Sequence, residues 1–312
     1  MKKLLHNILR LLRPRQWLKN FAIFAAILFS GQLFSTPTLL QILYGFGVFC
    51  ALSSAIYIIN DLFDQKKDRL HPFKRFRPLA TGEVPTSLAI VLAVVFLIGS
   101  FFASLLISPA FLLLSLTYFF LQLSYTLLFK HIEIIDILVL AGGYILRVYA
   151  GELITSFHIS AWLFLTTISL ALFLAVGKRR SELTLLASQQ SIIAATRKTL
   201  SHYNEKMLDV YLSIFATSTF ISYALFTFLE IPHGSNLSND ILVSFLPVNL
   251  QKKWLMITIV PVVYGLMRYL QRIYEKHEGE SPERVLFSDR PLLSSVLIWT
   301  ILVITIIYVI KQ

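Results

Sequence analysis

The chain has 312 residues, of which 56% are hydrophobic and 14% are charged, and its formal net charge is +11. A soluble domain carries about a quarter charged residues, so this composition excludes an ordinary water-soluble fold. The single cysteine excludes a disulfide framework and a cysteine-rich metal site.

Nine apolar stretches, each long enough to span a bilayer as an α-helix, follow one another along the chain. We expect them at residues 17–34, 38–59, 87–107, 110–129, 134–153, 159–177, 207–229, 254–273 and 291–310. Residues 3–12, before the first span, are predicted to form an amphipathic helix on the membrane surface. The sequence therefore predicts an all-α polytopic membrane protein in which residues 1–312 form a single integral membrane domain.

The distribution of positive charge predicts how the chain is oriented. All 28 Lys and Arg residues except Arg147, Lys252, Lys253 and Lys311 fall on the same side of the predicted spans. Positive residues accumulate in cytoplasmic loops, so we expect the N-terminus, the long charged loops and a cavity on the cytoplasmic side of the inner (plasma) membrane. The net charge is then a topology signal, and no nucleic-acid partner is expected.

The loop after the second span carries "NDLFDQKKDRLHPFKRFRP", residues 60–78. Asp61, Asp64 and Asp68 follow one another at i, i+3 and i+7, so they line one face if the second span continues as a helix. Asn60 adds an amide oxygen one turn from Asp64. Hard oxygen ligands suit Mg²⁺, which is commonly shared with substrate phosphates. We therefore expect these four residues to bind Mg²⁺.

A basic segment follows this motif. Pro72 ends the predicted helix, and Lys74, Arg75 and Arg77 lie on a non-helical segment before Pro78. These cations can fold back over the metal and bind phosphate oxygens, the arginines in bidentate fashion. The alternative is a cytoplasmic loop whose acids balance its bases on a solvated face.

The stretch from Asn60 to Asp68 resembles the first aspartate-rich motif of the UbiA superfamily of intramembrane prenyltransferases. The resemblance implies nine helices around a cytoplasm-facing cavity and a Mg²⁺-diphosphate held by the motif. Members that prenylate aromatic rings carry a second D-x-x-x-D motif after the sixth helix. This chain has "GKRRSELTLL" there, and its nearest approach to that motif is Glu205 and Asp209.

Four stretches instead resemble the decaprenyl-phosphate phosphoribosyltransferase branch, which transfers 5-phosphoribose from phosphoribosyl pyrophosphate to a polyprenyl phosphate. They are "RPRQWLKN" (13–20), "DRLHPFKRFRP" (68–78), "KRRSEL" (178–183) and "SPERVLFSDRPLL" (281–293). The resemblance implies these two substrates and Mg²⁺ as partners. With Asp61, Asp64, Asp68 and Lys74 as the expected catalytic residues, the candidates for substrate binding are Lys19, Asn20, Arg69, Arg75, Arg77, Tyr125, Lys130, Lys178, Arg179, Glu182, Asp289 and Arg290.

Several of these candidates have an alternative structural role. Lys19 belongs to a basic segment that can anchor the first helix, and Tyr125 and Lys130 can lie at the membrane interface. Asp289 can cap the helix that begins near Pro291. Arg147, inside the fifth span, needs a partner, and a structural pair with Glu152 is the alternative to a catalytic role.

The chemistry of phosphoribosyl transfer agrees with this pattern. A lipid phosphate is already an anionic nucleophile, so no strong base is required, and catalysis reduces to positioning and charge neutralisation. We keep as alternatives a UbiA-type enzyme that moves a prenyl group from prenyl diphosphate to an aromatic acceptor, and a lipid-phosphate carrier, which the one-sided charge disfavours. Membrane lipid and, in a homo-oligomer, further copies of the chain are the other expected partners.

Overall fold

The computed structural model describes residues 2–70, 74–187, 203–230, 253–276 and 282–309, and all regular structure in these ranges is helical. The long helices are α3 (Thr36–Leu70), α5 (Thr86–Ile107), α6 (Pro109–Leu127), α7 (Ile135–Thr155), α8 (Ala161–Ala187), α10 (Glu205–Leu229), α11 (Ile259–Lys276) and α13 (Arg290–Ile304). Shorter helices are α1 (Lys2–Leu12), η1 (Pro14–Phe24), α2 (Ala25–Phe29), η2 (Lys74–Phe76), α4 (Pro78–Thr81), η3 (Phe129–His131), η6 (Trp254–Thr258), α12 (Pro282–Ser288) and η7 (Thr305–Val309). The prediction of an all-α membrane protein is confirmed.

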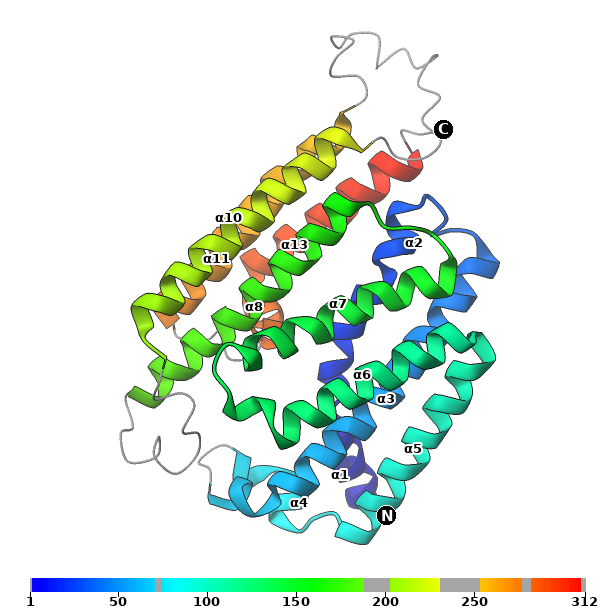
Figure 1. The fold of residues 1–312 in the computed structure, drawn as a ribbon, viewed down its shortest axis with the longest axis vertical. Coiled ribbons are helices and arrows are strands. Elements are labelled where there is room, and N and C mark those ends of the chain that lie inside the picture. The colour runs from blue at the N-terminus through cyan, green and yellow to red at the C-terminus, as the bar shows by residue number, and fades with distance from the viewer. Residues whose placement is uncertain (1, 71–73, 188–202, 231–252, 277–281, 310–312) are drawn as a thin grey trace.

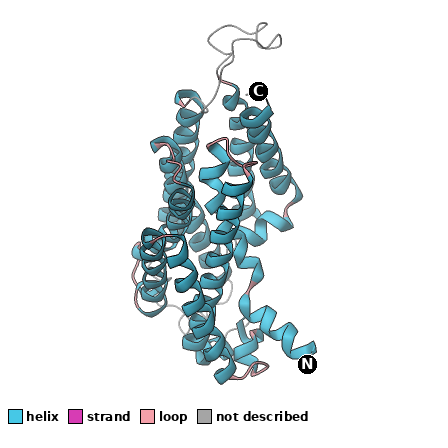
Figure 2. Cartoon of the chain, turned by 90° about the vertical axis from the view of Figure 1, so that its right-hand side faces the viewer, coloured by secondary structure: helices cyan, strands magenta, loops and turns pink. Residues whose placement is uncertain are grey.

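The long helices pack against one another as a bundle. Figure 1 shows α8, α10, α11 and α13 on one side, α3, α5 and α6 on the other, and α7 between the two groups. In the view turned by 90°, α1 projects from the lower end of the bundle (Figure 2). Helices that follow one another run in opposite directions, so the C-terminal ends of α3, α6, α8 and α11 lie at the same end. The predicted site residues are therefore brought to one end of the bundle.

Eight helices of the described part are long and apolar enough to cross a membrane, against the nine predicted. The difference lies in residues 17–34, which do not form one continuous helix. They begin as the 3₁₀ helix η1, which starts at Pro14, and continue into the five-residue helix α2. Gly31 then adopts a φ of 77°, a left-handed conformation that glycine tolerates and that commonly ends a helix. This segment packs against α3 and α7 inside the bundle.

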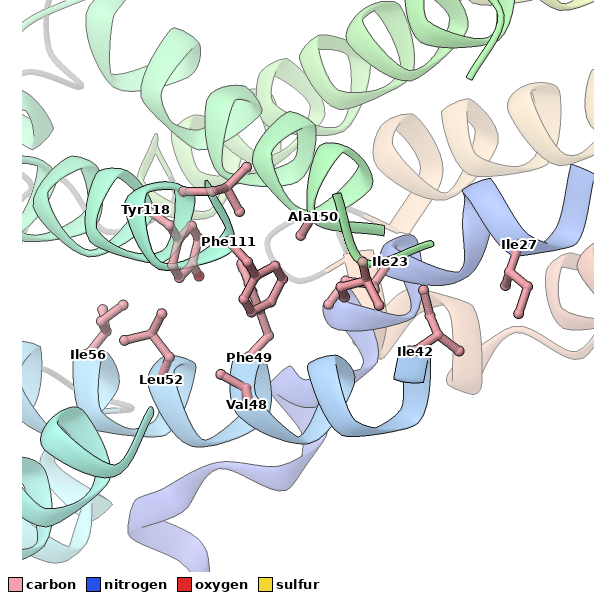
Figure 3. Close-up of a cluster of buried hydrophobic side chains, with 12 residues drawn as sticks. Ile23, Ile27, Ile42, Val48, Phe49, Leu52, Ile56, Phe111, Tyr118 and Ala150 are labelled. Atoms are coloured by element: carbon pink, nitrogen blue, oxygen red, sulfur yellow. The ribbon is translucent and has the colours of Figure 1, made fainter. Parts of the chain in front are cut away.

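One apolar cluster fixes η1, α2, α3, α6 and α7 relative to one another. Figure 3 shows side chains of α3 facing those of α6 and α7, with Ile23 of η1 and Ile27 of α2 close by. Phe49 of α3 meets the ring of Phe111 of α6 edge to face, with centroids 5.7 Å apart. Because the cluster lies next to the polar ends of α3 and α6, it holds the walls of the site in place.

The closest approach between η1 and α7 requires a glycine. A Cβ atom on Gly151 would lie 2.0 Å from the backbone oxygen of Ile23. Backbone cannot move aside as the tip of a side chain can, so only glycine lets the 3₁₀ segment lie directly on α7.

Candidate active site

A cavity of about 290 Å³ lies at the polar end of the bundle, where η1, α3, α6, α7, α8 and α12 meet. Nine of the residues predicted from the sequence line it: Lys19, Asn60, Asp64, Lys74, Arg77, Tyr125, Lys130, Lys178 and Glu182. They come from segments that are far apart in the chain. The fold therefore brings about half of the predicted residues to one place.

The aspartate motif lies on one helix, because α3 continues without a break to Leu70. Asp61 is buried, and its Oδ1 accepts hydrogen bonds from Arg13 Nη2 at 2.5 Å and from Arg77 Nη1 at 3.0 Å. The same Arg77 nitrogen lies 2.6 Å from Oδ2 of the buried Asp68. Two of the three carboxylates thus hold Arg77, and these contacts fold the basic segment back over the end of α3.

Asn60 and Asp64 are the two motif residues that line the cavity. Asp64 Oδ1 accepts a hydrogen bond from Lys130 Nζ at 2.8 Å, and Asn60 Oδ1 accepts one from Thr126 Oγ1 at 3.1 Å. Within the described ranges, no three His, Cys, Asp or Glu side chains are grouped so that they could hold one metal ion. Mg²⁺ is usually held by one or two carboxylates together with substrate phosphates, and the oxygens of Asp64 and Asn60 fit that mode.

The electrostatics of the cavity favour an anionic ligand. Its lining contains the cations Arg13, Lys19, Lys74, Arg77, Lys130 and Lys178 and the acids Asp64, Glu182 and Glu283. Cations therefore outnumber carboxylates two to one. Phosphate groups bind to such surfaces through charge-assisted hydrogen bonds.

Arg179 lies beside this cavity without being part of its lining. Its side chain is 1% exposed, and it forms ion pairs with Asp136, at 2.6 Å, and with Glu182. Arg179 Nη2 also donates to the hydroxyl of Tyr125 at 2.7 Å, and Asp136 accepts a further hydrogen bond from Tyr203 at 2.6 Å. Arg179 thereby fixes the positions of Tyr125 and Glu182, which do line the cavity.

Arg147 holds a second buried position, next to η1. Its guanidinium donates to Asn20 Oδ1 at 2.7 Å, to the Gly143 carbonyl at 2.6 Å and to the Tyr118 hydroxyl at 2.5 Å. A structural pair with Glu152 does not form, because Glu152 instead contacts His158 at 2.7 Å. Asn20, predicted to bind substrate, is fully buried under Arg147.

The remaining predicted residues lie outside the lining. Arg69 donates to the Ala80 carbonyl at 3.1 Å, and the guanidinium of Arg75 lies 4.8 Å from the centre of the Phe76 ring. Asp289 caps α13, as its Oδ1 accepts from the Leu292 amide at 2.9 Å, and Arg290 is exposed.

Asp289 also joins α13 to α11. Arg268 donates to both of its carboxylate oxygens, at 3.0 and 2.8 Å, and these hydrogen bonds hold the pKa of Asp289 below its ordinary value. The N-cap role that the sequence left open is therefore present.

Sequence reasoning left several polar residues of the cavity lining unassigned, among them Gln16, Tyr57, Gln122, Thr126, Tyr144 and Glu283. A local signal existed for Tyr57 and Glu283. Tyr57 lies one turn before Asp61 on α3, and Glu283 belongs to the "SPERVLFSDRPLL" stretch. Gln16 links them, because it accepts from the Tyr57 hydroxyl at 3.2 Å and donates to Glu283 Oε1 at 2.6 Å.

Fold and site together define a multi-pass membrane protein with a cation-rich cavity at the end of an aspartate-bearing helix. The family model of the UbiA prenyltransferase family matches residues 20–289. The chain belongs to this family, and it is an enzyme, a transferase of the membrane.

Curated relatives resemble the chain over nearly its whole length. Decaprenyl-phosphate phosphoribosyltransferase of Corynebacterium glutamicum is 32% identical over 99% of this chain and 89% of that protein. The enzymes of the same name from Mycolicibacterium smegmatis and Mycobacterium tuberculosis are 32% and 31% identical over 96% and 95% of this chain, and over 91% and 92% of their own lengths.

Solved structures show the same fold. A UbiA homolog from Archaeoglobus fulgidus, bound to DMAPP and Mg²⁺, matches 96% of this chain and 98% of its own with a TM-score of 0.67 at 21% identity. The structure of that homolog bound to GPP and Mg²⁺ gives a TM-score of 0.66 at 20% identity, covering 96% and 99% of the two chains.

Proposed function

We propose that this enzyme transfers 5-phosphoribose from phosphoribosyl pyrophosphate to a polyprenyl phosphate and releases diphosphate. The names of the relatives that match nearly the whole chain support this substrate pair. The observation that carries the proposal is the excess of cations in the cavity lining, since both substrates are polyanions. An aromatic acceptor would bring no phosphate and would leave much of this charge without a ligand.

The reaction needs few chemical groups from the protein. An oxygen of the lipid phosphate attacks the anomeric carbon of the donor, the bond from that carbon to the diphosphate oxygen breaks, and the configuration inverts. The nucleophile is already ionised, so no proton has to be removed. Mg²⁺, when bound, would neutralise charge on the departing diphosphate.

Residues of the chain would position the two substrates. Asn60 and Asp64, which face the cavity, would hold the metal-diphosphate, and release of Arg77 would bring in Asp61 and Asp68. The cations Lys74 and Lys178, with Arg77, would bind phosphate oxygens of the donor and the acceptor. Lys130, which contacts Asp64, would orient that carboxylate.

The region after α8 supports phosphoribosyl transfer over the prenylation of an aromatic acceptor. Arg180 forms ion pairs with both acids that come nearest to a second aspartate-rich motif, Glu205 at 3.1 Å and Asp209 at 2.7 Å. Asp209 also accepts from the Tyr274 hydroxyl at 2.8 Å. These two acids thus join α8, α10 and α11, and neither acid lines the cavity.

The protein would lie in the inner membrane, and the polar end of its bundle would face the cytoplasm. Water-soluble donor and lipid acceptor would then meet at the cytoplasmic surface. The positive residues of the N-terminal segment and of the loops on this side of the spans support that orientation.

A transfer assay tests the proposal. Membranes that contain the protein are incubated with Mg²⁺, labelled phosphoribosyl pyrophosphate and a polyprenyl phosphate, and label in the lipid phase is counted. We expect lipid-bound label that disappears with a chelator and persists in Glu205→Gln and Asp209→Asn. Absence of lipid label, together with prenyl transfer to an aromatic acceptor that the same two variants abolish, would refute the proposal.

A further inference from the structure

The part of the cavity wall that α12 contributes contains a buried carboxylate, one oxygen of which accepts no hydrogen bond from the described residues. The Glu283 side chain is 8% exposed, and it lines the cavity together with its neighbour Pro282. Its Oε1 accepts the hydrogen bond from Gln16, whereas its buried Oε2 forms an ion pair with Lys19 Nζ at 3.5 Å and accepts no hydrogen bond from any described residue. Buried polar atoms in native proteins nearly always have a hydrogen-bond partner, so a buried oxygen without one in a cavity wall indicates a place for a ligand that donates.

The fold holds this carboxylate in a defined position. Two residues further along α12, Val285 is 2% exposed and packs in an apolar cluster with residues of α8, α11 and α13, among them Phe173 and Leu292. The hydrogen bond from Gln16 ties the carboxylate to η1. Packing of Val285 therefore anchors α12, and the hydrogen bond from Gln16 fixes the Glu283 carboxylate at the border of the cavity.

Glu283 is also ionised. Burial raises the pKa of its carboxyl, but the nearby Lys19 ammonium, the hydrogen bond from Gln16 and the charge of Lys178 outweigh burial and hold the pKa below its ordinary value. An ionised carboxylate only accepts hydrogen bonds, so its ligand must donate. A metal ion is disfavoured at this oxygen, because Lys19 Nζ lies 3.5 Å from it and would repel a second cation.

We propose that Glu283 Oε2 accepts a hydrogen bond from a ribose hydroxyl of the donor and selects a sugar diphosphate over a prenyl diphosphate. This inference rests on the proposed function. The two ribose hydroxyls are the hydrogen-bond donors that this reaction brings to the cavity, since ionised phosphates only accept and a prenyl chain has no hydroxyl. A carboxylate in the wall also repels a misplaced diphosphate, and so directs the sugar end of the donor to α12.

Deoxy analogues of the donor test this assignment. The kcat/KM of the full-length protein is measured with phosphoribosyl pyrophosphate and with its 2-deoxy and 3-deoxy analogues, for the wild type, Glu283→Ala, Glu283→Gln and Arg284→Ala. Arg284 is an exposed neighbour on α12 and serves as the control for disturbing that helix.

We expect the wild type to prefer the full donor over at least one analogue by about 10- to 100-fold, the range for a lost hydrogen bond to a charged group. Glu283→Ala should lose about this factor on the full donor and little on that analogue, so that the preference disappears. Glu283→Gln keeps the side-chain volume and a neutral acceptor, and it should lose part of the preference while remaining folded. Arg284→Ala should keep the whole preference.

Two results would overturn the inference in distinguishable ways. If both Glu283 variants lose activity equally on the donor and on both analogues, Glu283 supports the structure of α12 and does not contact the sugar, while the proposed function stands. If the wild type transfers no phosphoribose at all, the proposed function fails, and this inference fails with it.

Discussion

Substitution of two neighbouring cations of α8 should have different effects: loss of Lys178 should lower activity, and loss of Arg179 should lower stability. Lys178 lines the cavity, whereas Arg179 is 1% exposed and paired with Asp136 and Glu182. Removing Arg179 leaves two carboxylates without their counter-ion in a buried position. Loss of one partner from a buried ion pair costs about 3–5 kcal/mol.

This cost should be visible as a loss of thermal stability. For a large chain each kcal/mol lowers the Tm by roughly 2 °C, so Arg179→Ala should lower it by about 6–10 °C. Lys178→Ala should leave the Tm nearly unchanged and reduce kcat/KM by about 10- to 100-fold, because one charge-assisted phosphate contact is lost.

Both variants are purified in detergent, the Tm is followed by intrinsic fluorescence, and kcat/KM is measured in the transfer assay. Arg179→Lys serves as the matched variant, because it keeps the charge while losing the planar fork that reaches three partners. An Arg179→Ala protein with the wild-type Tm and a raised KM for either substrate would show that Arg179 binds substrate, and the reasoning from burial would be wrong.

Three further predictions concern other parts of the molecule. Asp64→Asn should reduce turnover by orders of magnitude with an unchanged Tm, since Asp64 faces the cavity and its role is in the site; full activity would contradict its assignment to the metal. Gly151→Ala should lower the Tm by forcing η1 away from α7, at a cost of about 1–3 kcal/mol, whereas Gly99→Ala, where a new Cβ meets no atom within 4 Å, should not. Hydrogen bonds from Arg268 hold the pKa of Asp289 below its ordinary value. The ionised Asp289 therefore stabilises the folded protein fully above a pH of about 4, and this contribution is lost as the pH falls further. Asp289→Asn should flatten this part of a plot of Tm against pH.

The sequence predicted those parts of the site that depend on spacing along one helix. Asp61, Asp64 and Asp68 lie on one continuous helix because their spacing matches the helical repeat and Pro72 lies beyond the last of them. Hydropathy located the long helices for the same reason, as each span is a local property of about 20 residues.

Contacts between distant segments escaped sequence reasoning. Glu283 and Gln16 are 267 positions apart, and no local pattern indicates that they share a hydrogen bond. The resemblance of "KRRSEL" also suggested that Arg179 contacts a substrate, whereas the structure pairs its side chain with Asp136. The first span was predicted as one helix because hydropathy does not register the 3₁₀ start at Pro14 or the left-handed Gly31.

The buried guanidinium of Arg147 has a consequence for the energy of the empty protein. Its partners are an amide oxygen, a backbone carbonyl and a hydroxyl, and within the described ranges no carboxylate forms an ion pair with it. It lies 5.7 Å from the ring centre of Tyr144, whose side chain lines the cavity. The guanidinium of Arg147 carries a full positive charge. It therefore adds a positive potential to the side of the cavity formed by Tyr144, in a medium of low dielectric constant. A polyanion bound in the cavity would therefore add counter-charge near Arg147, and binding of such a ligand to the folded protein would raise its stability.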